Sequence, residues 1–220
     1  MVESKWRICA AVVEDAPEAL QRVAPLVDLF ELRIDLIGSG WRDLAAGLEK
    51  PWIACNRRVE EDGRWQGSES GRISELISAV ELGADIVDIE LATPDLASVV
   101  REVKGRTDCL LSHHDLKGTP SLDEMKSIVE RQLDAGADIC KVVTTARNIT
   151  DNISVIRLVS CFPGKNIIAF AMGAVGYLSR VLSPLAGGYL TYASIAEGLE
   201  SAPGQITVDV LYELYGLLDK

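Results

Sequence analysis

Short apolar segments recur along this chain, separated by amphipathic segments. Eight of them predict buried strands, because most are continuously hydrophobic and rich in Ile and Val, as strands covered on both faces of a parallel sheet are. The predicted strands are 7–14, 29–37, 52–58, 84–91, 108–115, 138–146, 166–173 and 188–194. This alternation constrains the fold more than any other feature, and it predicts an α/β protein built from repeated strand–helix units.

The intervening segments have the periodicity and end signals of helices. Ser, Thr, Asp or Asn opens several of them and Gly or Asn follows several, which satisfies free backbone groups at helix ends. The predicted helices are APEALQRVAPLV, SGRISELISAVELG, TPDLASVVREVKG, SLDEMKSIVERQLDAG, NITDNISVIRLVSC and GQITVDVLYELYGLLDK. Eight strands alternating with helices in 220 residues favour a (β/α)8 TIM barrel, with residues 1–220 as a single domain. An open doubly wound sheet is the alternative, but no GxGxxG motif follows the first strand.

Composition excludes several classes of function. A net charge of -11 argues against nucleic acid, so an anionic ligand needs a local group of arginines. The longest apolar runs are too short or too rich in Gly to span a membrane, and the N-terminal segment lacks the features of a signal peptide. The five cysteines (Cys9, Cys55, Cys109, Cys140 and Cys161) show no CxxC spacing. We therefore expect a reduced, cytoplasmic protein without disulfides or structural zinc.

Charged side chains inside or just after the apolar strands are the candidates for function, because an unpaired buried charge is costly or shifts its pKa. The strand 29–37 contains Glu31, Arg33 and Asp35 at alternate positions, and hence on one face. The others are Arg57, Arg58, Asp88, Glu90, Asp115, Lys141 and Arg180. In a barrel, the carboxyl ends of the strands form the active-site face, so this set predicts a site there. The polar segment 58–71 is then a candidate mobile lid, or a solvated loop without a role.

Lys141 stands among Ile, Cys and Val in ADICKVVTTA. Burial there should lower its pKa and leave more free amine, which suits a Schiff base with a ketone or aldehyde. The alternative is a lysine that points outward and pairs with an acid.

The two histidines are adjacent, at positions 113 and 114 of the segment SHHDLKGTP. Strand alternation sends their side chains to opposite faces, so a shared metal or substrate is not expected. A Schiff-base enzyme needs a proton shuttle near neutral pH, and one histidine can supply it. The other is then a structural residue. Ser201 and Gln205 lie in ESAPGQI, a loop that either binds a polar ligand or only caps the last helix.

Six motifs together resemble the class I 3-dehydroquinate dehydratase family, in a compact form like the archaeal one. They are ELRID, NRRVEEDG, SHHDLKGTP, ADICKVVTTA, AMGAVGYLSRV and SAPGQI, in order over residues 29–206. The resemblance implies a (β/α)8 barrel that is a cytoplasmic homodimer. Its reaction would be the dehydration of 3-dehydroquinate to 3-dehydroshikimate in aromatic amino-acid biosynthesis, without a metal or organic cofactor.

The resemblance also implies roles for individual residues. Lys141 would form the imine with the C3 ketone, His114 would be the general acid and base, and Glu61 would orient His114, with Glu60 as the neighbouring alternative. The residues implied in substrate binding are Glu31, Arg33, Arg57, Met172, Arg180, Ser201 and Gln205, with Arg180 holding the carboxylate. Phe170 stands where the family often has Met, and His113 receives no catalytic role.

Two other functions remain open from the residues alone. One is another Schiff-base barrel, such as an aldolase for a phosphorylated sugar, which would favour a glycine-rich phosphate site after the last two strands. The other is an inactive barrel that serves as a binding or scaffold protein. A costly buried lysine argues against the second.

Overall fold

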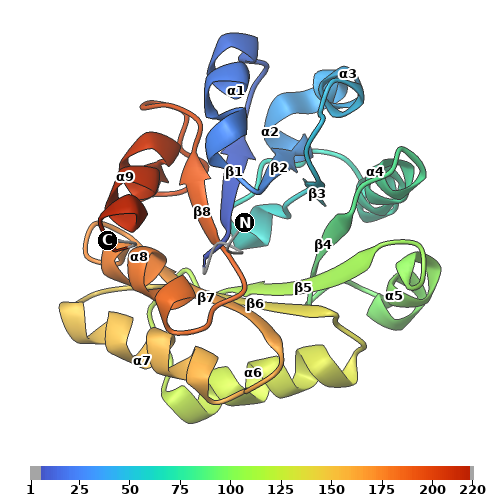
Figure 1. Ribbon diagram of the computed structural model, residues 1–220. Helices are drawn as coiled ribbons and strands as arrows, with labels where there is room; N and C mark the ends of the chain where they lie inside the picture. Colours follow the sequence, from blue (N-terminus) through green and yellow to red (C-terminus); the bar gives the residue numbers. More distant parts are fainter. Residues whose placement is uncertain (1–5, 219–220) are drawn as a thin grey trace.

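The computed structural model describes residues 6–218, which form a ring of parallel strands surrounded by helices (Figure 1). The strands are β1 (Ile8–Val12), β2 (Leu29–Arg33), β3 (Trp52–Cys55), β4 (Ile86–Glu90), β5 (Asp108–His114), β6 (Ile139–Thr145), β7 (Asn166–Met172), β8 (Thr191–Ser194) and β9 (Ile206–Thr207). The helices are α1 (Pro17–Val23), α2 (Ile34–Ile37), α3 (Trp41–Ala46), α4 (Glu69–Glu81), α5 (Leu96–Val103), α6 (Leu122–Asp134), α7 (Ile149–Ser160), α8 (Tyr177–Leu185) and α9 (Val208–Leu218).

The strands pair in parallel, in the order β7-β6-β5-β4-β3-β2-β1-β8-β9. Strands that follow one another in the chain are neighbours, and β8 pairs with β1, which curls the sheet round on itself. The remaining gap, between β7 and β8, is bridged by the Tyr189 N–H, which donates to the Ile167 carbonyl at 2.8 Å. All eight predicted strands are present, and the predicted (β/α)8 barrel is confirmed.

Side chains alternate between the barrel interior and the layer under the helices, as the pleat requires. An apolar floor closes the interior, formed by Cys9, Leu29, Ile53, Ile86, Leu110, Ile139, Ile168 and Leu190. On several strands the inward side chain two residues further toward the carboxyl end is polar, as in Glu31 on β2 and Lys141 on β6. The fold therefore places the functional groups above this apolar layer, at the carboxyl-terminal end of the barrel.

Three predictions about elements were wrong. Strand β2 ends at Arg33, so Asp35 belongs to α2 and does not continue the face of Glu31. Helices α3 and α8 were not predicted, since both lie in glycine-rich segments and α8 contains Pro184. The last helix begins at Val208, after the two residues of β9 pair with β8. Asp219 and Lys220, which close the predicted helix, lie outside the described residues.

The connection from β7 to α8 turns so tightly that it needs a glycine. A Cβ built on Gly176 would lie 2.4 Å from the Met172 carbonyl oxygen, far inside van der Waals contact. This turn lets α8 pack on the outside of the barrel against β7 and β8, with Arg180 buried near the start of the helix. Within residues 6–218, no helix combines the length and apolar character needed to cross a membrane.

Candidate active site

A cavity opens at the carboxyl ends of the strands. It is lined by all ten predicted site residues: Glu31, Arg33, Arg57, Glu61, His114, Lys141, Met172, Arg180, Ser201 and Gln205. Six further residues complete the wall: Cys55, Asp62, Val143, Phe170, Tyr192 and Ala202. Residues from motifs spread over most of the chain thus meet in one place, because parallel strands end at the same face.

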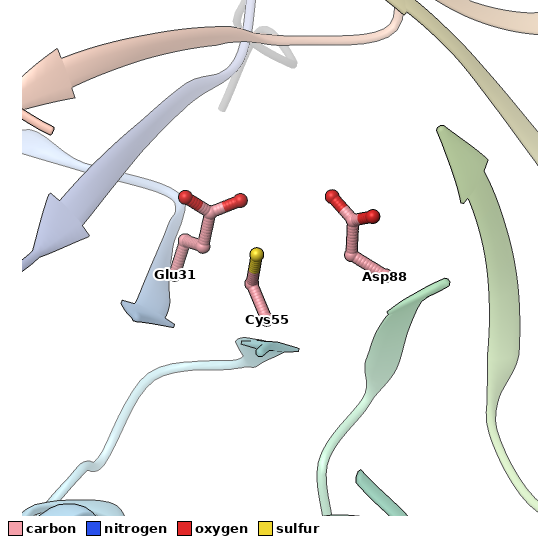
Figure 2. A group of neighbouring side chains, drawn as sticks. All are labelled: Glu31, Cys55 and Asp88. Carbon is pink, nitrogen blue, oxygen red and sulfur yellow. The ribbon is translucent and has the colours of Figure 1, made fainter. Parts of the chain in front are cut away.

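Lys141 lies at the centre of a cluster of buried acids. Its Nζ is 2.9 Å from Asp88 Oδ2 and 3.3 Å from Glu31 Oε1. Figure 2 shows the two carboxylates facing each other with the Cys55 thiol between them. These three residues offer ligand atoms within 4.8 Å of one another, a spacing that would suit a cation. The cation they hold is the Lys141 ammonium.

The predicted free amine of Lys141 is wrong for the enzyme without substrate. Burial lowers the pKa of Lys141, as expected, but the charges of Asp88 and Glu31 outweigh burial and raise that pKa above its ordinary value. Lys141 is therefore an ammonium in this state and must lose a proton before it can attack a carbonyl carbon.

Asp88 is held by three donors. It accepts from Lys141, from Arg57 Nη2 at 2.6 Å and from the Ser112 hydroxyl at 2.5 Å. Burial raises its pKa, but Arg57, Lys141 and these hydrogen bonds outweigh burial and hold the pKa well below its usual range. Asp88 is thus a permanent anion. From the sequence, Asp88 was predicted only as a charged residue within a strand, without a functional role.

Arg57 is engaged within the protein. Besides Asp88, its guanidinium donates to Ser112 Oγ at 2.6 Å and lies 3.1 Å from Glu90 Oε1. Glu90 in turn accepts from Arg72 Nη1 at 2.6 Å. Arg57 lines the cavity, as predicted for a substrate-binding residue, but its buried contacts also make it part of the charge network beneath Lys141.

His114 projects from the end of β5 into the cavity and is oriented by Glu61. The two are joined by a 2.7 Å hydrogen bond between His114 Nδ1 and Glu61 Oε2. Glu60, by contrast, has a side chain that is 71% exposed and pairs with Arg58. The geometry thus favours Glu61 over Glu60. His113 does not line the cavity, in agreement with the predicted opposite facing of the two histidines.

Burial tunes the protonation of this pair. Desolvation, reinforced by the charges of Arg57 and Lys141, lowers the pKa of His114 well below its ordinary value, so the ring is neutral at neutral pH. Desolvation raises the pKa of Glu61 to about 7. When Nδ1 carries the hydrogen and donates it to Glu61, Nε2 keeps its lone pair for a proton from a bound molecule.

The opposite wall of the cavity contains buried donors without partners. Arg180 Nε and Nη2, Gln205 Nε2 and the Tyr192 hydroxyl are buried and make no hydrogen bond among the described residues. Burial lowers the pKa of Arg180 to about 10, and its guanidinium lies 4.3 Å from the centre of the Phe170 ring. Phe170 therefore fills the position where the family often has Met and packs on the arginine. Unpaired donors of this kind fit an anionic, hydroxylated ligand.

The end of β2 and the loop before β9 meet at the edge of the cavity. Arg33 is paired with Asp35 at 2.8 Å and donates weakly to the Ser201 carbonyl at 3.4 Å. The Ser201 N–H donates to Gln205 Oε1 at 2.7 Å, which turns the amide nitrogen of Gln205 toward the interior. Asp35 thus positions Arg33 and does not line the site itself.

A buried lysine, a neutral histidine with a carboxylate partner and an unpaired arginine define a class of protein: a barrel enzyme that forms a Schiff base with a small anionic carbonyl compound. Comparison with known proteins is more specific. The family model for type I 3-dehydroquinase matches residues 8–220. The chain belongs to this family.

Individual relatives agree. The chain is 46% identical over 186 residues to the 3-dehydroquinate dehydratase of Dehalococcoides mccartyi strain 195, with 84% of each chain covered. It is 35% identical over 220 residues to that of Methanocaldococcus jannaschii, covering 96% of this chain and 99% of the relative. The crystal structure of the 3-dehydroquinate dehydratase from Geobacillus kaustophilus superposes with a TM-score of 0.86 at 26% identity, covering 97% and 91% of the two chains.

Family membership decides between the functions that the residues left open. The chain is an enzyme, a hydro-lyase of the shikimate pathway, and it dehydrates 3-dehydroquinate through a Schiff base. An aldolase named QR15 superposes with a TM-score of 0.65 at 14% identity, which shows the shared barrel alone.

Proposed function

We propose that Lys141 carries the Schiff base with the C3 ketone of 3-dehydroquinate and that His114 transfers the protons. The iminium on Lys141 withdraws electrons and acidifies the neighbouring C2–H bond. His114 Nε2 then takes the C2 proton, the electrons move into an enamine, and the C1 hydroxyl leaves as water when His114 returns a proton to it. Glu61 holds the histidine in the tautomer that this sequence requires.

The remaining lining residues bind the substrate. Arg180 receives the carboxylate through Nε and Nη2, two donors that have no hydrogen-bond partner within residues 6–218. Gln205 and Ser201 receive hydroxyl groups from the loop above, and Met172 forms an apolar wall. Glu31, Arg33 and Arg57 complete the polar contacts on the other side.

The proposal extends to the domain organisation, oligomeric state and location of the protein. We propose that residues 1–220 form one catalytic domain, and that the enzyme is a cytoplasmic homodimer. Among the described residues, the group whose spacing would suit a metal is Glu31, Cys55 and Asp88, and the Lys141 ammonium already pairs with both of its carboxylates. The proposed mechanism uses neither a metal nor an organic cofactor.

One observation carries these assignments: Lys141, His114 and the unpaired Arg180 line a single cavity. The test is turnover of 3-dehydroquinate, followed by the absorbance of the conjugated product, in the native enzyme and in Lys141→Ala. The native enzyme should turn over and the variant should not. Full activity in Lys141→Ala would overturn the role of the lysine while leaving the family assignment intact.

A further inference from the structure

The two carboxylates beside Lys141 are not equivalent. Asp88 accepts from three donors at 2.5 to 2.9 Å and is not part of the cavity lining. Glu31 accepts from Lys141 at 3.3 Å, and its side chain lines the cavity. One acid is thus saturated and sealed, while the other is loosely bonded and can exchange a proton with whatever fills the cavity.

This difference matters because Lys141 has to change its protonation during the reaction. The ammonium must lose a proton to attack the ketone, yet the nitrogen must be positively charged again when it becomes an iminium. A single acid cannot serve both steps well, since a good proton acceptor is a poor permanent counter-ion.

We propose that Asp88 is the fixed counter-ion of the Lys141 nitrogen, and that Glu31 accepts the proton that activates it. In the first step an Nζ–H bond breaks, the proton passes to a Glu31 oxygen, and the freed lone pair forms the C–N bond to C3 while the carbonyl electrons move to oxygen. The alkoxide then takes a second proton from Nζ and becomes a hydroxyl, and the proton on Glu31 is returned to this hydroxyl as it leaves as water. The nitrogen is then an iminium beside Asp88, and Glu31 is again a carboxylate.

Several observations support this division. Asp88 is held in the charged state by Arg57, whose guanidinium is fixed in turn by Ser112 and Glu90. The Tyr192 ring lies 4.2 Å from Nζ and offers its face to the same positive charge. Other titratable or charged groups that act on this nitrogen, or on which it acts, are Cys9 on β1, Cys55 on β3, Arg57 after β3 and His114 on β5. Burial raises the pKa of the Cys9 and Cys55 thiols, so both are neutral.

The proposal rests on Lys141 as the Schiff-base residue and can fail separately from it. The experiment is single-turnover trapping: enzyme in excess of 3-dehydroquinate is quenched with borohydride at successive times, and the adduct is measured by mass at several pH values. An adduct in the native enzyme establishes the lysine. Only the variants then test the two acids.

Glu31→Gln should lower the plateau rate of adduct formation, on the order of 100-fold at saturating substrate, because the acceptor is gone. A plateau rate equal to that of the native enzyme would overturn the role of Glu31.

The rate of adduct formation should fall at low pH, where Lys141 stays protonated; this fall is the acid limb of the profile. Asp88→Asn should keep the plateau rate but move the acid limb to lower pH. Removing the anion makes Lys141 give up its proton more easily. Steady-state turnover should still fall, on the order of 100-fold, since an uncharged imine withdraws electrons poorly. An acid limb at the native pH would overturn the role of Asp88.

Ser112→Ala is the matched control, because it removes one hydrogen bond to Asp88 without removing a charge, and it should leave the limb in place. If Asp88→Asn does not fold, Asp88→Glu takes its place, and its retained charge should keep the limb near the native pH. A large shift of the limb in Ser112→Ala or Asp88→Glu would contradict the proposal.

Discussion

The two sides of the cavity differ in how completely their buried polar groups are paired. On the side of β3, β4 and β5, the charges of Arg57, Asp88 and Glu90 satisfy one another at 2.6 to 3.1 Å. On the side of β7 and β8, donors of Arg180, Gln205 and Tyr192 are buried without a partner in the part of the chain that the structure describes. The first side is complete in the free enzyme and sets protonation states. The second side becomes complete only when a ligand supplies the missing acceptors.

This difference separates two kinds of residue. A paired network is costly to disturb, because removing one member leaves another charge buried and alone. An unpaired buried donor destabilises the free protein, and it gains a hydrogen bond when a ligand with an acceptor binds. Substitutions on the two sides should therefore have opposite effects on the stability of the free enzyme.

The largest loss of turnover is expected on substitution of His114. His114→Ala should lower turnover by about 10² to 10⁴-fold, because the proton shuttle is lost. The matched control is His113→Ala, which changes the neighbouring residue outside the cavity and should keep most of the activity. Steady-state kinetics on both variants measures the contrast. Similar losses in the two would show that the cavity does not distinguish them.

Arg180→Met tests the unpaired side. Loss of the carboxylate contact should raise the KM for 3-dehydroquinate by about 10² to 10³-fold. The same variant should stabilise the free protein by about 1–3 kcal/mol, since two buried orphan donors disappear. Thermal unfolding without substrate measures the second effect. A lower melting temperature in Arg180→Met would contradict the idea that these donors are kept for the ligand.

Glu61 should make stability depend on pH. Its pKa in the folded protein is about 7, above the ordinary 4.5, so the folded state binds the proton more tightly than the unfolded chain does. This stabilisation is fully present below the ordinary pKa and is lost as the pH rises through about 7. Glu61→Gln should therefore lose less stability over that range than the native protein, by about 1–3 kcal/mol.

Urea unfolding at a series of pH values measures this difference. Glu60→Gln is the control, because that side chain is 71% exposed and should follow the native curve. Parallel curves for Glu61→Gln and the native enzyme would show that Glu61 titrates normally.

The smallest effect is expected at Phe170, whose ring packs on the Arg180 guanidinium at 4.3 Å. Phe170→Met restores the residue that the family often has there, and it removes a cation–π contact of about 1 kcal/mol. KM should rise only a few-fold and turnover should stay close to native. A change as large as that of Arg180→Met would mean that the ring itself orders the binding site.

The sequence predicted most of the fold and ten of the residues that line the cavity, and the reasons are physical. Continuous apolar runs identify buried strands, and the common end of parallel strands brings Lys141, His114 and Arg180 together wherever they lie in the chain. Helix α8 was missed because the glycines on either side of it and Pro184 within it oppose local helix formation, while packing against β7 and β8 stabilises it.

The charge of Lys141 could not be predicted locally. It depends on Asp88 and Glu31, which lie 53 and 110 residues away in the chain. The neighbours Ile, Cys and Val indicate only burial, and burial alone gives the wrong direction for the pKa. Likewise, nothing in the sequence shows that Arg57 has its donors occupied while Arg180 has two of them free. Which buried donors have partners is decided by contacts between residues far apart in the chain, which form only in the folded protein.

The central claim is that Lys141 forms a covalent imine with 3-dehydroquinate in this cavity. It is tested by treating the enzyme with 3-dehydroquinate and borohydride, digesting the protein and locating the added mass. The account predicts one reduced adduct, on the peptide that contains Lys141, with irreversible loss of turnover. An active enzyme that acquires no adduct, or one that carries it on another lysine, would contradict the account.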